Sequence, residues 1–220
     1  MTRETKFAIL LTVFIAAISI LNIISQKVAV FEIWNLALPF SAGILAYAMT
    51  FPITDTIAEV WGKGHAKLVV WLGFIANLVT LALSQIAIHA TPADFWEEQD
   101  VVFRMVMEGV PRIIAASLLA YLVAQLHDLW AFHFWKKVTK GRHLWLRNNL
   151  STFTSQLLDS TIFTIVAFAN LGFLAGSVAW SDIPKFIGIY WILKLIVALI
   201  DTPIVYALVY WCRRGDSPSQ

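Results

Sequence analysis

Long apolar runs dominate the chain, and short polar segments separate them. Each run is long enough for a membrane-spanning helix, which needs about 20 apolar residues. No run shows the alternation of apolar and polar residues that is typical of strands. The pattern predicts an all-α, polytopic membrane protein, a single domain over residues 1–220 with six transmembrane helices in one bundle. The expected helices are residues 7–26, 41–60, 66–88, 111–130, 148–177 and 184–211.

The segments between the runs carry turn and interface signals. Gly62-Lys63-Gly64 predicts a tight turn. Residues 90–110 mix acidic and aromatic side chains, as an amphipathic segment at the membrane surface does. Pro111 is a favourable residue for the first turn of the helix that follows. The first run is too long for a signal peptide and lacks a small-residue cleavage site, so we expect it to be a retained helix.

Composition narrows the class of protein further. The chain is 59% hydrophobic and 14% charged, whereas soluble domains are about 45–50% apolar and about 25% charged. These values exclude a cytosolic enzyme and a disordered chain. The net charge of +2 is too small to attract a nucleic acid. The one cysteine excludes a disulfide scaffold and a cysteine zinc site, and we expect no cofactor and no metal.

Lysine and arginine residues are unequally divided between the two expected sides of the membrane, which sets the orientation. With the N-terminus inside, eleven lie on the cytoplasmic side and four outside, while Lys194 lies within a helix. Both termini are therefore predicted to be cytoplasmic. The cytoplasmic set is Arg3, Lys6, Lys63, Lys67, Lys136, Lys137, Lys140, Arg142, Arg147, Arg213 and Arg214.

Ionisable residues occur inside the expected spans, where each costs about 2.5–3.5 kcal/mol and needs a partner or a cavity. The second helix has Asp55 and Glu59 on one face, one turn after Pro52. The sixth has Lys194 near its middle and Asp201 two turns later. The fifth carries a polar stripe of Asn148, Thr152, Ser155 and Asp159, with Gln156 beside it. Asn22, Gln125 and Asp128 add polar groups to the first and fourth helices.

These residues have a structural and a functional interpretation. Ser, Thr, Asn and Gln commonly hydrogen-bond neighbouring helices, and Glu59 could pair with Lys63. Arg112, Asp128 and Arg147 lie near helix ends, where they could reach the interface or hold a loop. The deeper Asp55, Asp159 and Lys194 favour a polar cavity, since buried ion pairs are an expensive way to hold helices together.

Enzymatic and ATP-driven chemistries are poorly supported. The histidines are expected at helix ends or in loops, too shallow for a paired haem or metal site: His65, His89, His127, His133 and His143. The chain has no Walker A motif and no intramembrane protease signature. The residues alone therefore predict a carrier for a small solute, coupled to an ion gradient or to a separate energising partner.

Three stretches together resemble a known family. The first joins NIISQK to FPITDTIAEVWGKGHAK, the second joins RIIAASLLAYLVAQLHD to LWLRNNLSTFTSQLLDSTIF, and the third is KLIVALIDTPIVYAL. This combination, from Asn22 to Tyr206, resembles the queuosine precursor transporters within the vitamin uptake transporters. Trp61 and Lys67 depart from the residues usual in that family.

The resemblance implies an inner-membrane importer of 7-deazaguanine bases, with a cyano or aminomethyl group, destined for tRNA modification. It implies a protein that is not an enzyme and needs no dedicated ATPase. The alternatives are a related vitamin carrier, a substrate-binding component of an energy-coupling-factor transporter, or a structural membrane protein. A homodimer is also compatible with the sequence.

Chemistry suggests the roles of the polar residues. A carboxylate accepts the adjacent N–H donors of a guanine-like edge, and an amide can read its carbonyl. We expect Asp159, Gln156 and Asn22 to contact the base, while Lys194 balances one carboxylate. Asp55 and Glu59 are expected to respond to protonation or to hold a closing helix. The candidate substrate-binding residues are Asp159, Gln156, Asn22, Gln125, Ser155 and Lys194, and those for coupling or gating are Asp55, Glu59, Arg112, Asp128, Arg147 and Asp201.

Overall fold

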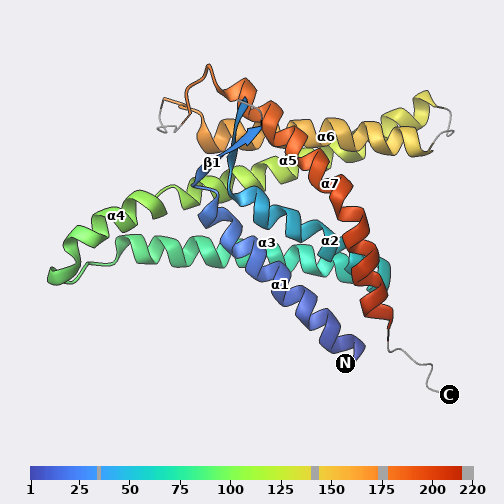
Figure 1. Cartoon of the computed structure of the whole chain (residues 1–220), viewed down its shortest axis with the longest axis horizontal. Coiled ribbons are helices and arrows are strands. Elements are labelled where there is room, and N and C mark those ends of the chain that lie inside the picture. Colours follow the sequence, from blue (N-terminus) through green and yellow to red (C-terminus); the bar gives the residue numbers. More distant parts are fainter. Residues whose placement is uncertain (34–35, 140–143, 173–177, 215–220) are drawn as a thin grey trace. The chain divides into compact units, whose positions relative to one another are not determined.

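The computed structural model describes the chain except for residues 34–35, 140–143, 173–177 and 215–220. Helices dominate the described residues (Figure 1). The elements are α1 Arg3–Ile24, β1 Val28–Ile33, β2 Leu36–Ser41, α2 Gly43–Trp61, α3 Lys63–His89, the 3₁₀ helix η1 Asp94–Trp96, α4 Glu97–Met107, α5 Val110–Val138, α6 Leu144–Phe168 and α7 Ile183–Arg213.

Internal contacts divide the chain into two units, and each is described by itself. Unit 1 contains Met1–Phe31, Ser41–Pro111 and Leu193–Gln220. Unit 2 contains Glu32–Phe40 and Arg112–Ile192. Unit 1 therefore holds α1 to α4 and most of α7, and unit 2 holds most of α5, all of α6 and the first part of α7.

The prediction of an all-α chain is wrong for residues 28–33 and 36–41, because β1 and β2 pair into a two-stranded sheet. The backbone N–H of Ala42 donates to the carbonyl of Lys27 at 2.8 Å, beside the sheet. Val28, Val30 and Phe31 are the β-branched and aromatic types that favour strands. Since β1 is apolar except for Glu32, it lacks the alternation that would have revealed it.

Several helix boundaries differ from the sequence expectation. Helix α1 begins earlier, at Arg3, because the Thr2 hydroxyl caps it and accepts from the Thr5 N–H at 3.2 Å. Helix α5 continues to Val138 instead of ending near residue 130. Helix α6 ends at Phe168, although the apolar run predicts helix up to residue 177. Beyond it, Ala169 forms a parallel bridge with Val178.

The core of unit 1 forms where α1, α2 and α3 pack together. Leu10, Phe14, Ile57 and Val69 are buried there. Gly73 of α3 allows this approach, since a Cβ at that position would lie 2.8 Å from the Phe14 ring. The predicted turn between α2 and α3 is confirmed at Gly62, whose φ of 87° favours glycine.

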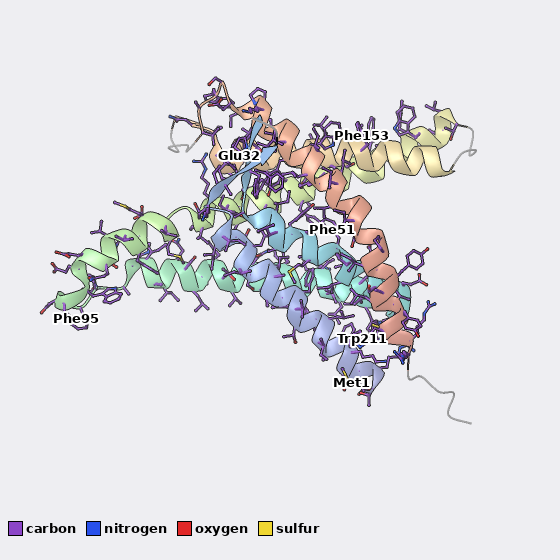
Figure 2. The ribbon with its side chains drawn as sticks, viewed as in Figure 1. Met1, Glu32, Phe51, Phe95, Phe153 and Trp211 are labelled. Atoms are coloured by element: carbon purple, nitrogen blue, oxygen red, sulfur yellow. The ribbon has the colours of Figure 1, made fainter. Side chains whose placement is uncertain are left out.

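The two ends of the chain meet in unit 1. The Lys6 ammonium donates to the carbonyls of Cys212 and Arg214 at 2.9 and 2.6 Å. Arg3 donates to the Val60 carbonyl, at the end of α2. Met1 and Trp211 accordingly lie at the same end of this unit (Figure 2). Basic residues from the start of α1 and the end of α7 thus gather on one side.

In unit 2, α5 and α6 are antiparallel neighbours, since Arg112 contacts the end of α6 while His127 contacts Ser155. Aromatic rings join α6 to α7. Phe163 stacks on Tyr190 with ring centroids 5.4 Å apart.

Exposed apolar side chains cover the outer helix faces. On α3, Trp71 and Ile86 are 64% and 67% exposed, a surface that suits lipid rather than water. Three stretches of described helix are long and apolar enough to cross a membrane, namely Arg3–Ile24, Gly64–His89 and Asp94–Ala124. Phe153–Phe168 is a shorter apolar helix. These features are those of a multi-pass membrane protein.

Candidate functional site

Asn22 joins α1 to α3 inside unit 1. Its side chain is fully buried, and Nδ2 donates to Asn77 Oδ1 at 2.7 Å. This bond joins two neighbouring helices, as expected for asparagine residues within spans. Asn22 Oδ1 has no hydrogen-bond partner among the described residues. The Asn22 atom that is available to a solute is therefore Oδ1, a hydrogen-bond acceptor for an N–H donor.

Lys194 lies in the interior of unit 1, beside an aromatic ring of α2. Its side chain is 5% exposed, and Nζ lies 4.9 Å from the centroid of the Tyr47 ring. A cation over an aromatic face gains about 2 kcal/mol when desolvated. The Tyr47 ring also contacts Phe51 edge-on, at 4.6 Å between centroids. Sequence reasoning missed Tyr47, although it lies two turns before Asp55 on α2.

Two more carboxyl groups lie on the same two helices, Asp55 on α2 and Asp201 on α7. Asp201 on α7 is 7% exposed, and its Oδ1 has no hydrogen-bond partner among the described residues. Asp55 on α2 is exposed.

Glu59 and Arg213 form an ion pair at the end where the termini meet. Arg213 Nη2 lies 2.7 Å from Glu59 Oε1, and both side chains are 60% exposed. The expected partner Lys63 has a side chain outside the described residues. An exposed pair of this kind contributes about 0–1 kcal/mol, so Glu59 marks the helix ends rather than a buried solute site.

In unit 2, Ser155 is held by a histidine. The Ser155 hydroxyl lies 3.1 Å from His127 Nδ1. The expectation that His127 sits at a helix end is wrong, because α5 continues for eleven residues beyond it. Ser155, one of the predicted substrate-binding residues, thus already has a partner. His127 is a further site candidate, which the sequence alone placed at a helix end because the predicted helix was too short.

Helix α6 presents buried polar atoms along a stripe next to the predicted one. Ser160 and Thr164 are fully buried, and their hydroxyl oxygens have no hydrogen-bond partner among the described residues. Gln156 Oε1 is in the same situation. These three positions follow one another at i, i+4 and i+8, which places them on one helix face. Asp159 is half-buried on the neighbouring face.

Arg112 holds the end of α6. Its Nε donates to the Val166 carbonyl at 2.6 Å, and Nη2 donates to the Ala169 carbonyl. The last carbonyls of a helix lack intrahelical partners and carry partial negative charge. Arg112 therefore has the structural role that its place near a helix end suggested.

The structure divides the predicted residues between the units. Asn22, Lys194, Asp55, Glu59 and Asp201 belong to unit 1. Asp159, Gln156, Ser155 and Arg112 belong to unit 2. Gln125, Asp128 and Arg147 lie on α5 and α6, and their side chains are outside the described residues.

Unit 1 also contains a hollow of about 450 Å³ between α1, α2 and α7. Every residue that lines it is apolar or aromatic, including Val13, Met49 and Leu208. Because none of the predicted site residues lines it, this hollow does not account for the binding of a polar solute.

Comparisons with known proteins agree on a class. A family model described as "Putative vitamin uptake transporter" matches residues 41–208. A Bacillus subtilis (strain 168) protein named "Probable queuosine precursor transporter" is 34% identical over 183 residues, which cover 83% of this chain and 76% of that protein. No solved structure matches the chain.

Proposed function

Since this chain belongs to the vitamin uptake transporter family, we propose that it imports queuosine precursors, which are 7-deazaguanine bases with a cyano or aminomethyl group. The observation that carries this proposal is the identity to the Bacillus subtilis protein over 83% of the chain. The family consists of transporters, so the chain is a transport protein and not an enzyme.

The proposed topology has six membrane crossings, with both termini in the cytoplasm of a cell whose inner membrane holds the protein. The contacts of Lys6 with Cys212 and Arg214 support it, because an even number of crossings returns the chain to its starting side. Arg3 and Arg213 lie at the same end. Basic residues favour the cytoplasmic side.

For the substrate contacts we propose Asp159, Gln156 and Asn22. The buried Oε1 of Gln156 and Oδ1 of Asn22 support this assignment, since both are acceptors without a partner among the described residues. A 7-deazaguanine edge offers N–H donors to such acceptors, and a carboxylate at Asp159 accepts two at once.

Replacing the proposed carboxylate tests this assignment. Asp159→Ala should abolish most uptake of labelled base at equal membrane expression. Without the carboxylate, the N–H donors of the base have no acceptor in the site, and the base binds far more weakly. Asp94→Ala, at an exposed carboxylate of η1, is the matched control and should transport as the native chain does. Native uptake by Asp159→Ala would refute the contact.

The family description also favours a second candidate, a vitamin uptake carrier. If that carrier worked as the substrate-binding component of an energy-coupling-factor transporter, as the resemblance allows, it would need a partner ATPase and a membrane coupling protein. Under our proposal neither is required. Uptake by the chain alone, reconstituted in liposomes as a monomer or homodimer, separates the two candidates.

A further inference from the structure

The apolar hollow of unit 1 is open to the surroundings of the helices. Leu10 of α1 and Ile53 of α2 are buried and form its floor. Val13, Met49 and Ile204 also line it, and their side chains are exposed. The hollow of about 450 Å³ is therefore a groove on the surface of unit 1 that a neighbouring molecule can enter.

The chemistry of this groove suits the hydrocarbon of a lipid. Its described lining contains no charged side chain. An empty groove leaves the atoms that line it without van der Waals partners on one side, so a filled groove is the more stable state. In a bilayer the apolar material that surrounds the helices consists of acyl chains, and these fill an apolar groove as well as another helix does.

The groove reaches from one end of the helices to the depth of one lipid leaflet. Trp211, which lines it, lies two residues before Arg213 at the end of α7. Ile204 lies about 14 Å along α7 from Arg213, and Val13 lies about 15 Å along α1 from Arg3, at 1.5 Å per residue. The hydrocarbon core of a bilayer is about 30 Å thick, so that one leaflet is about 15 Å deep.

Basic side chains gather at the end of the groove where Trp211 lies. Lys6 Nζ is 5.9 Å from the centroid of the Trp211 ring. Arg3, Arg213 and Arg214 belong to the same end of unit 1, and their side chains are exposed. Guanidinium groups bind phosphate oxygens with paired, charge-assisted hydrogen bonds. The three arginines can therefore reach the phosphate of a lipid whose acyl chain enters the groove.

Acidic groups at this end do not cancel the positive charge. Glu59 is paired with Arg213, and Glu4 lies in the first turn of α1. Lys6 and the three arginines outnumber them by four to two. Lys6 also donates to two carbonyls at the end of α7, whose partial negative charge would otherwise repel an anion. The ends of α1, α2 and α7 thus present a net positive charge to a headgroup.

We propose that the groove holds an acyl chain of an anionic phospholipid, whose phosphate lies against Arg3, Arg213 and Arg214. A zwitterionic lipid offers the same hydrocarbon, but the excess of positive charge favours a headgroup with a net negative charge. With the proposed topology, the lipid belongs to the cytoplasmic leaflet. This site is separate from the proposed contacts of the solute, because none of those residues lines the groove.

A photoreactive phosphatidylglycerol with a diazirine on its acyl chain tests the site directly. The purified full-length protein is placed in phosphatidylcholine vesicles that contain a trace of this lipid, illuminated, and analysed by peptide mass spectrometry. Cross-links should concentrate on the lining of the groove, above all on Met49 and Leu208. Added phosphatidylglycerol should compete with the probe, and the same amount of phosphatidylcholine should not. Equal cross-linking of the exposed Trp71 and Ile86, or equal competition by phosphatidylcholine, would overturn the proposal.

Loss of the arginines tests the part of the headgroup. The double variant Arg3→Gln with Arg214→Gln should weaken cross-linking in the groove by about fivefold for each arginine lost, since each basic residue near a membrane surface contributes about that factor to anion binding. Arg104→Gln is the matched control, because Arg104 pairs with Asp100 on α4, and it should be labelled as the native chain is. Native labelling of the double variant would overturn the role of the headgroup.

Filling the groove gives an independent comparison. Ala48→Phe adds a ring to the lining and should abolish cross-linking there, whereas Leu83→Phe, at an exposed position of α3, should leave it unchanged. Undiminished labelling of Ala48→Phe would contradict binding in the groove. A second copy of the chain is the other possible occupant. Disulfide-linked dimers of Met49→Cys in a Cys212→Ala background would show that occupant instead and overturn the lipid site.

Discussion

Arg112 shows how a charged residue of a transporter can hold the backbone of a neighbouring helix. Its guanidinium spans from α5 to the last carbonyls of α6, around Val166 and Ala169. The sequence placed it near a helix end but left open whether it served structure or transport. Only the fold reveals its acceptors, because backbone carbonyls have no signature in a sequence.

Arg112→Ala should lower the free energy of unfolding by about 3 kcal/mol or more, since it removes two hydrogen bonds from a charged group, which contribute about 1.5–3 kcal/mol each. Thermal unfolding in detergent measures the loss. Arg104→Ala is a suitable control, because Arg104 pairs with Asp100 at a partly exposed site and should change stability by less than about 1 kcal/mol. Equal losses in both variants would contradict the role of Arg112.

The hydrogen bond between Asn22 and Asn77 links α1 to α3. A double-mutant cycle of Asn22→Ala and Asn77→Ala should give a coupling energy of about 0.6 kcal/mol, and no more than about 2, as for other hydrogen bonds between membrane helices. Unfolding in a denaturing detergent provides the four free energies. Strict additivity would mean that the bond does not form in the membrane.

At the scale of whole elements, apolar runs located the centre of every long helix. They failed where a short element or a polar stretch broke the pattern. Strand β1 is almost entirely apolar, so its sequence does not distinguish it from a connection between helices. Helix α5 continues through the aromatic and basic residues around Trp135, beyond the end that the apolar run predicts near residue 130. His127 therefore lies well inside the helix and not at its end.

The prolines of α2 and α7 allow an element-level test. Pro52→Ala restores a backbone donor in α2 and should stiffen it, so the maximal uptake rate is expected to fall severalfold while the affinity for the base changes little. Initial uptake rates over a range of base concentrations separate the two effects. Pro111→Ala is the control, because a proline in the first turn of α5 blocks no internal hydrogen bond. An unchanged rate in Pro52→Ala would argue against bending of α2.

At the scale of the whole molecule, composition was sufficient to identify a membrane protein. The candidate site was only partly accessible to sequence reasoning. Helical spacing marked Asp55 and Asp201, but only the fold shows that Asp201 is buried while Asp55 is exposed. No sequence pattern pairs Lys194 with Tyr47, which are separated by more than half of the chain.

The topology itself is testable. Phe95 is 85% exposed and lies in unit 1 far from Met1 and Trp211 (Figure 2). Phe95→Cys in a Cys212→Ala background should react with a membrane-impermeant maleimide from outside intact cells. A fluorescent protein fused to the C-terminus should fold and fluoresce, as it does in the cytoplasm. Labelling of Phe95→Cys only after the cells are opened would contradict the proposed orientation.

The central claim is that this chain carries 7-deazaguanine bases into the cell. The most direct measurement expresses it in a strain that neither makes queuosine nor imports its precursors, feeds the cyano or the aminomethyl base, and determines queuosine in tRNA. We predict that queuosine appears with the native chain and is greatly reduced with Asp159→Ala. Absence of queuosine with both bases, despite native chain in the membrane, would contradict the claim.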